Sequence, residues 1–138
     1  MDWQDVYEDV IALDFEFFSA TEGDRQNPVC LVSESLRTGL QTRLWITKGA
    51  KCPLPSGPEY LYVGYFASAE WNCFLSLGWG LPARIIDLYA EYRRMTNGAA
   101  GHTTRLGYGL LAAAEAFGIA AMDANYKTDM RELIISGG

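Results

Sequence analysis

The run 10–18 is apolar except for two acids, Asp14 and Glu16, and it constrains the fold more than any other feature of the sequence. Its length and its content of Val, Ile and Phe are typical of a buried β-strand. Side chains alternate between the faces of a strand, so the two acids share one face and their apolar neighbours occupy the other. The fold must therefore bury this strand and still accommodate two like charges side by side.

The two acids allow two interpretations. Carboxylates buried together without partners destabilise a protein, and a divalent cation such as Mg²⁺ or Mn²⁺ would remove that penalty because it prefers oxygen ligands. Alternatively, the strand has one hydrated face and both acids are simply solvated. The apolar residues on either side of the acids argue against an edge strand. The residues alone leave both interpretations open.

Composition indicates one ordinary globular domain. The chain has 138 residues, of which 49% are hydrophobic and 20% charged, enough for a single core. No apolar run reaches the roughly 20 residues of a membrane span. The acidic N-terminus differs from the basic start of a signal peptide, so a cytoplasmic protein is expected. The net charge of −6 argues against broad non-specific nucleic-acid binding but not against a nuclease, whose carboxylate site stays acidic until metal ions bind.

The cysteines and the histidine give no sign of a zinc site. The three cysteines, Cys30, Cys52 and Cys73, are widely spaced and form no C-x-x-C pair. They are expected to be reduced and structural. The single histidine, His102, excludes a site built from several imidazoles.

The pattern along the chain predicts a mixed sheet with helices packed against it. The expected strands cover residues 10–18, 29–36, 40–46, 60–66 and 84–88, with a hairpin turn at 37–39 and a loop at 48–58. The expected helices cover residues 69–77 with Ser68 as the N-cap, 89–95, 104–117 and 121–134. Arg93, Arg94 and Arg105 are candidates for contact with a phosphate backbone or, alternatively, for a solvated helix face.

Two stretches carry a resemblance to a known family. Residues 11–16, I-A-L-D-F-E, resemble the first motif of the DEDD (DnaQ-like) 3′–5′ exonuclease superfamily. Residues 63–70, V-G-Y-F-A-S-A-E, align without gaps with its second motif, V-G-x-N-x-x-Y/F-D, and place Glu70 at the acid. Phe66 and Ala69 depart from the usual Asn and aromatic residue. An offset alignment would place Asn72 at the acid instead, but a metal site needs a carboxylate.

The resemblance covers roughly residues 8 to 138, and the stretches 71–98 and 130–133 resemble the exonuclease domains of polymerase-I-like proteins. The Asp of I-I-D-L, Asp87, matches a family position that is mostly structural, so it is a secondary candidate. The third motif, Tyr-x-x-x-Asp or His-x-x-x-x-Asp, is absent. Tyr126 and Asp129 have the right letters but stand one residue too close. The expectation is a single domain over 1–138, truncated before the third motif.

The resemblance implies an RNase H-like α/β fold and hydrolysis of the terminal phosphodiester of single-stranded DNA, with RNA also possible, in proofreading, replication or repair. It implies two Mg²⁺ or Mn²⁺ ions, with Asp14 bridging both, Glu16 ligating one and helping to orient the attacking water, and Glu70 supporting the second ion. A fourth acid, expected to hold the first ion, is not found in the sequence. A polymerase domain or another protein is an expected partner. The alternative is a catalytically incomplete module that binds a nucleic-acid end or a protein.

Overall fold

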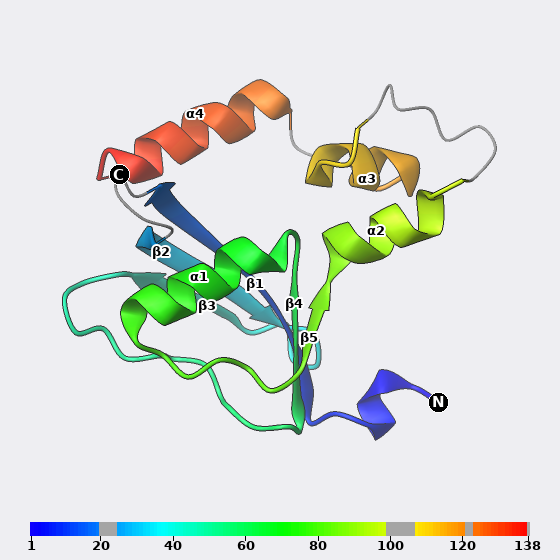
Figure 1. Ribbon diagram of the computed structural model, residues 1–138, viewed down its shortest axis with the longest axis horizontal. Helices are drawn as coiled ribbons and strands as arrows, with labels where there is room; N and C mark the ends of the chain where they lie inside the picture. Colours follow the sequence, from blue (N-terminus) through cyan, green and yellow to red (C-terminus); the bar gives the residue numbers. More distant parts are fainter. Residues whose placement is uncertain (20–24, 99–106, 121–122, 138) are drawn as a thin grey trace.

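The computed structural model describes residues 1–19, 25–98, 107–120 and 123–137, which form one mixed sheet with flanking helices (Figure 1). The elements of this part of the chain are η1 Trp3–Asp5, β1 Asp9–Ser19, β2 Gln26–Ser35, β3 Gln41–Trp45, β4 Tyr60–Gly64, α1 Ala67–Leu77, β5 Ile85–Asp87, α2 Leu88–Thr96, α3 Leu110–Ala116 and α4 Ala124–Ile135.

The five strands lie in the order β3-β2-β1-β4-β5. The pairs β1–β2 and β2–β3 are antiparallel, whereas β4 runs parallel to both β1 and β5. This arrangement confirms the predicted mixed α/β sheet and agrees with an RNase H-like fold. The strand with the two acids is the central one, as its apolar flanks indicated.

The main core lies between α1 and the sheet. Phe15 of β1 contacts Phe74 of α1 edge-on with ring centres 5.7 Å apart, and Phe74 contacts Trp79 at 5.5 Å. Leu31 of β2 and Cys73 of α1 are fully buried beside them. Burying these side chains supplies most of the hydrophobic stabilisation of the sheet, at about 1.5–3 kcal/mol for each large side chain.

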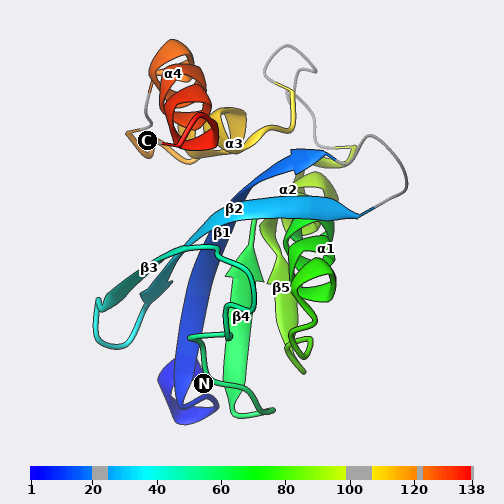
Figure 2. The ribbon, with the colours of Figure 1, turned by 90° about the vertical axis from the view of Figure 1, so that its left-hand side faces the viewer.

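The strand β1 is much longer than its parallel partner, and this difference creates an opening. β1 pairs with β4 only from Asp9 to Ala12, and β4 then ends at Gly64 and turns into α1. Pairing with β2 continues as far as Ser19, with an irregularity between Glu16 and Phe17. The later half of β1 therefore has one side without a neighbouring strand, and α4 crosses this half on the side away from α1 (Figure 2).

Two predicted helix starts were wrong. α1 begins at Ala67, so Ser68 lies in its first turn and is not the N-cap; Phe66 precedes the helix in a left-handed conformation with φ of 67°. The helix expected over 104–117 begins only at Leu110, because Gly107 has φ of 69° and Gly109 is extended. Residues 104–106 of that prediction, and 121–122 of the next, lie outside the described residues.

None of the helices in the described ranges combines the length and the apolar character needed to cross a membrane.

Candidate functional site

Asp14 and Glu16 lie on the face of β1 that is turned away from the α1 core. Their cross-strand partners on β2 are Val32 and Cys30, respectively, whereas Phe15 between them is 3% exposed and packs under α1. The acids lie just beyond the end of the parallel β1–β4 pair. In open α/β sheets, ligand sites form at this carboxyl end of the strands. The expected shared face is therefore present, at a position suited to a site.

Glu70 reaches the same part of β1 from the other side. It lies in the first turn of α1 and is 3% exposed. Its Oε2 accepts a hydrogen bond from the Phe15 N–H at 2.9 Å, on the side of β1 that β4 has left. Gly64, at the end of β4, lies against this side chain, since a β-carbon there would be in van der Waals contact with Glu70 Cγ at 3.4 Å. The fold thus brings Glu70 to the segment of β1 that carries both strand acids, whereas the alternative, Asn72, is only half-buried on α1.

Burial and neighbouring carboxylates raise the pKa of Glu70 and of Asp14. Burial raises the pKa of Glu70 to about 8, and the charges of Asp14 and Glu16 add to this effect, while the Phe15 amide opposes it. Asp14 keeps an accessible side toward solvent, but the surrounding protein removes enough hydration to raise its pKa, as does Glu16. Within the described residues, Glu70 forms no ion pair. A buried carboxylate without a cation is a functional-site candidate.

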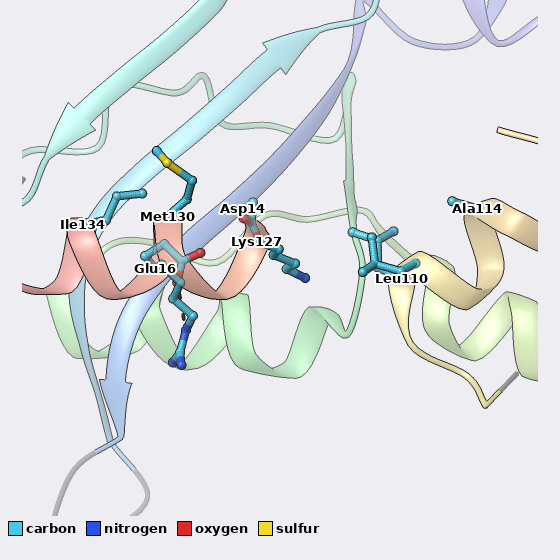
Figure 3. Close-up of a pocket in the computed structure, with 9 residues that line it drawn as sticks. Asp14, Glu16, Leu110, Ala114, Lys127, Met130 and Ile134 are labelled. Atoms are coloured by element: carbon cyan, nitrogen blue, oxygen red, sulfur yellow. Dashed lines mark hydrogen bonds and ion pairs between the residues drawn. The ribbon is translucent and has the colours of Figure 1, made fainter. Parts of the chain in front are cut away.

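Two cations of α4 face the strand acids. Arg131 Nε lies 3.1 Å from Glu16 Oε2, and its Nη2 donates to the Phe17 carbonyl at 3.4 Å. Lys127, one turn earlier on α4, lowers the pKa of Asp14 by its charge. Figure 3 shows Lys127 projecting beside Asp14, with Met130 and Ile134 on the same face of the helix. The acids at the strand surface are thus partly neutralised from within the chain.

A pocket of about 460 Å³ separates the strand from α3 and α4. Its lining combines the two acids and two cations with an apolar wall made of Leu110, Leu111, Ala114, Met130 and Ile134. This volume falls in the range of small-molecule sites, and a mostly apolar lining with a few convergent charges is typical of them. The pocket is large enough for a nucleotide-sized group beside the acids.

The carboxylates of Asp14, Glu16 and Glu70 are the right ligand type for a hard divalent cation, but in this structure they are not close enough together to bind one ion. Three carboxylates are the ligands that Mg²⁺ and Mn²⁺ prefer. Among the described residues, however, no three acidic, cysteine or histidine side chains lie close enough together to hold one ion. Glu16 bends toward Arg131 rather than toward Glu70. Metal binding at all three acids would require Glu16 to leave Arg131.

Asp87 has a structural role in this fold. Its Oδ1 accepts hydrogen bonds from Tyr89 N–H at 2.9 Å, as the N-cap of α2, and from Phe66 N–H at 3.0 Å. It therefore fixes the left-handed turn that leads from β4 into α1, and through that turn the start of the helix that carries Glu70. This agrees with the structural role that the sequence comparison implied.

Replacing Asp87 with Ala should destabilise the protein by about 1–2 kcal/mol from the lost cap alone, with a further loss from the unsupported Phe66 turn. Asp123 caps α4 in the same way but supports no left-handed residue, so Asp123→Ala is the matched control and should have the smaller effect. Urea unfolding measures both. Asp87→Asn keeps the acceptor and should recover most of the stability; if it is as damaging as Ala, the role assigned to Oδ1 is wrong.

The remaining candidates lie away from the pocket. Tyr126 is 54% exposed and Asp129 is exposed, and both are on α4 outside the face that lines the pocket. Neither supplies a fourth acid in this arrangement. The residues that the sequence reasoning missed are Lys127 and Arg131. Their spacing of four places them on one stripe of α4 together with apolar Met130, and a cation on an apolar helix face is a signal for a buried acid opposite.

No protein-family model matches this sequence, and no curated protein matches it either.

Proposed function

We propose that the pocket lined by Asp14 and Glu16, with Glu70 buried behind β1, hydrolyses the 3′-terminal phosphodiester of single-stranded DNA with the help of Mg²⁺ or Mn²⁺. The observation that carries this proposal is Glu70, a buried carboxylate with a raised pKa that reaches the edge of β1 beside two further acids. A carboxyl group buried beside two further acids, with no ion pair of its own among the described residues, favours a divalent ligand. The resemblance of residues 11–16 and 63–70 to exonuclease motifs points the same way.

The position of each acid relative to the pocket indicates its role in the proposed reaction. Asp14, open to the pocket, and Glu70, behind it, would hold the ions, and Glu16 would orient the attacking water once Arg131 is displaced. When bound there, Mg²⁺ or Mn²⁺ would supply Lewis-acid chemistry, by acidifying the attacking water and offsetting the charge that develops on the leaving oxygen. Lys127 places a positive charge beside Asp14, where it can pair with a substrate phosphate. The apolar wall from α3 and α4 limits access of water to the pocket.

A second function is favoured by the ion pair between Arg131 and Glu16. It neutralises one acid internally, and among the described residues no carboxylate other than Asp14 and Glu16 lines the pocket. Both features suit a nuclease-like module that binds a nucleic-acid end, a polymerase domain or another protein without cutting. They also lead us to expect slow turnover by this chain if it is an enzyme.

The test is shortening of 5′-labelled single-stranded DNA, and in parallel RNA, with Mn²⁺ or EDTA. Slow shortening from the 3′ end is expected with Mn²⁺ only, and Asp14→Asn should abolish it. Asp129→Asn removes an exposed acid of α4 outside the pocket and should leave the rate unchanged. Equal activity in the wild type and Asp14→Asn would exclude this site. Binding of the strand without shortening would establish the second function instead.

A further inference from the structure

Arg93 on α2 is held in place by aromatic rings. Its guanidinium carbon lies 5.0 Å from the ring centre of Tyr108 and 5.7 Å from that of Tyr89, and its Nη1 donates to the Tyr89 hydroxyl at 3.4 Å. Tyr89 is fixed in turn by edge-on contacts with Phe66 and Tyr65. Stacking against rings orients the plane of a guanidinium while leaving its edge available.

The charge of Arg93 is not matched within the described part of the chain. Its neighbour Arg94 pairs with Glu91 at 2.9 Å, and Arg131 pairs with Glu16 at 3.1 Å, but Arg93 forms no ion pair there. Its Nε and Nη2 groups make no hydrogen bond to any described residue either. In a chain with a net charge of −6, an exposed and pre-oriented arginine without a carboxylate suits an anion from outside the protein.

There is room for such an anion beside the guanidinium. A pocket of about 390 Å³ is lined by Ala90, Arg93, Arg94, Asn97 and Tyr108. Asn97 adds an amide and Arg94 a second guanidinium to the donors around it. The guanidinium of Arg93 is a planar fork of N–H groups, and with these further donors beside it, it matches the geometry of two phosphate oxygens.

The cluster is connected to the acidic pocket through the start of α3. The ring of Tyr108 covers Arg93, and Tyr108 is followed by Gly109, the N-cap of α3. Leu110, the first residue of α3, lines the pocket of Asp14 and Glu16. The Tyr65 hydroxyl donates to the Tyr108 carbonyl and ties this segment to the end of β4. In Figure 1, α2 and α3 lie next to each other at the end of the sheet where the acids are.

From these features we infer that Arg93 contacts a backbone phosphate of single-stranded nucleic acid whose 3′ end enters the acidic pocket. The inference rests on the proposed function for the direction of the strand, but its contact does not need hydrolysis or a metal. A phosphodiester chain and free inorganic phosphate share the chemistry that Arg93 recognises. Only the chain also reaches past Leu110 to the acids, so we assign the strand as the ligand.

Fluorescence anisotropy with labelled oligothymidylate in EDTA tests the contact without any cleavage. Arg93→Ala should weaken binding on the order of 10-fold, as expected for one charge-assisted hydrogen-bonding group. It should also reduce the slope of log affinity against log salt by about 0.7, the value for one phosphate on a single strand. Arg93→Lys should keep the slope and recover only part of the affinity, because the planar fork is lost.

Arg43→Ala is the matched control, since it removes one exposed arginine from β3, on the opposite edge of the sheet from β5. It should change neither affinity nor slope. The inference is overturned if Arg93→Ala behaves like Arg43→Ala, if the wild type does not bind the strand, or if inorganic phosphate competes as well as the oligonucleotide does. Thermal melts confirm that each variant is folded. Intact Arg93-dependent binding without Mn²⁺-dependent shortening would reject the proposed hydrolysis alone.

Discussion

Glu70→Gln should stabilise the protein by a few kcal/mol at pH 9 and leave its stability almost unchanged at pH 4. The expected size follows from a pKa of about 8 in the folded state against 4.5 for an ordinary glutamate, at about 1.4 kcal/mol per unit as an upper bound. Glutamine keeps the shape of the side chain and can accept the same hydrogen bond from Phe15 N–H. It cannot carry the buried charge that the wild type must accept at high pH.

The direction follows from proton binding. With a raised pKa, the folded state holds a proton on Glu70 that the unfolded state has already released, so stability falls as pH rises between about 4.5 and 8. The contribution is fully present below the unfolded value and is lost above the folded one. Asp14, whose pKa is also raised, adds to the fall in the same direction. Removing the charge of Glu70 should therefore flatten most of this dependence.

Urea unfolding in EDTA at intervals from pH 4 to 9 measures the effect. Glu132→Gln is the matched control, because it exchanges the same groups at an exposed position of α4, where the carboxylate is hydrated before and after unfolding. The free energy of unfolding of Glu132→Gln should show no gain over the wild type that increases with pH. If Glu70→Gln follows the wild type at every pH, the buried carboxyl group already has a compensating partner, and the main support for a cation site is lost.

The second large effect concerns Mn²⁺. An ion that binds only the folded state adds about 2.7 kcal/mol at about one hundred times its dissociation constant. The variant with Asp14→Asn and Glu16→Gln should lose this gain, while its metal-free form is as stable as the wild type or more so, because it has lost the repulsion between the acids. Conversely, Lys127→Gln with Arg131→Gln should bind Mn²⁺ on the order of 5-fold more tightly, since two competing charges are gone.

Thermal melts over a Mn²⁺ series, with EDTA as the reference, decide between these outcomes. Arg94→Gln breaks the exposed pair with Glu91 far from the pocket and controls for the loss of an arginine–glutamate pair as such. It should melt like the wild type at every Mn²⁺ concentration. If the variant without the two α4 cations gains no more than the wild type, those cations do not compete with the ion. If no variant responds, the metal part of the proposed function is wrong for this chain.

The sheet was predictable because its signals are local. The alternation around Asp14, the hairpin turn at 37–39 and the apolar run 60–66 each indicate their strand within a few residues, and β4 ends at Gly64. The start of α1 was not predictable in the same way. Ser68 has the residue type of an N-cap, but the chain enters the helix through Phe66, which is held by Asp87 from a strand more than twenty residues later. A contact at that separation overrides the local preference.

The candidate site likewise has parts that local sequence signals predict and parts that depend on contacts between distant residues. The shared face of Asp14 and Glu16 follows from strand geometry, and the preference for Glu70 over Asn72 followed from the need of a metal site for a carboxylate. The approach of Arg131 to Glu16 joins residues 115 positions apart, and it depends on how α4 docks across β1. Sequence periodicity identifies the stripe of α4 that carries Arg131, but it does not say which strand that stripe will meet.

The unpaired side of β1 has a consequence for self-association. A strand edge with open backbone groups can recruit a strand from another copy, and proteins protect such edges with inward charges or by covering them. Here the Phe15 amide is already taken by Glu70, and Asp14 and Glu16 repel an incoming chain. The acids that form the candidate site therefore also keep β1 from pairing between molecules. Variants that neutralise them have to be compared at low protein concentration, where aggregation does not mask the melting behaviour.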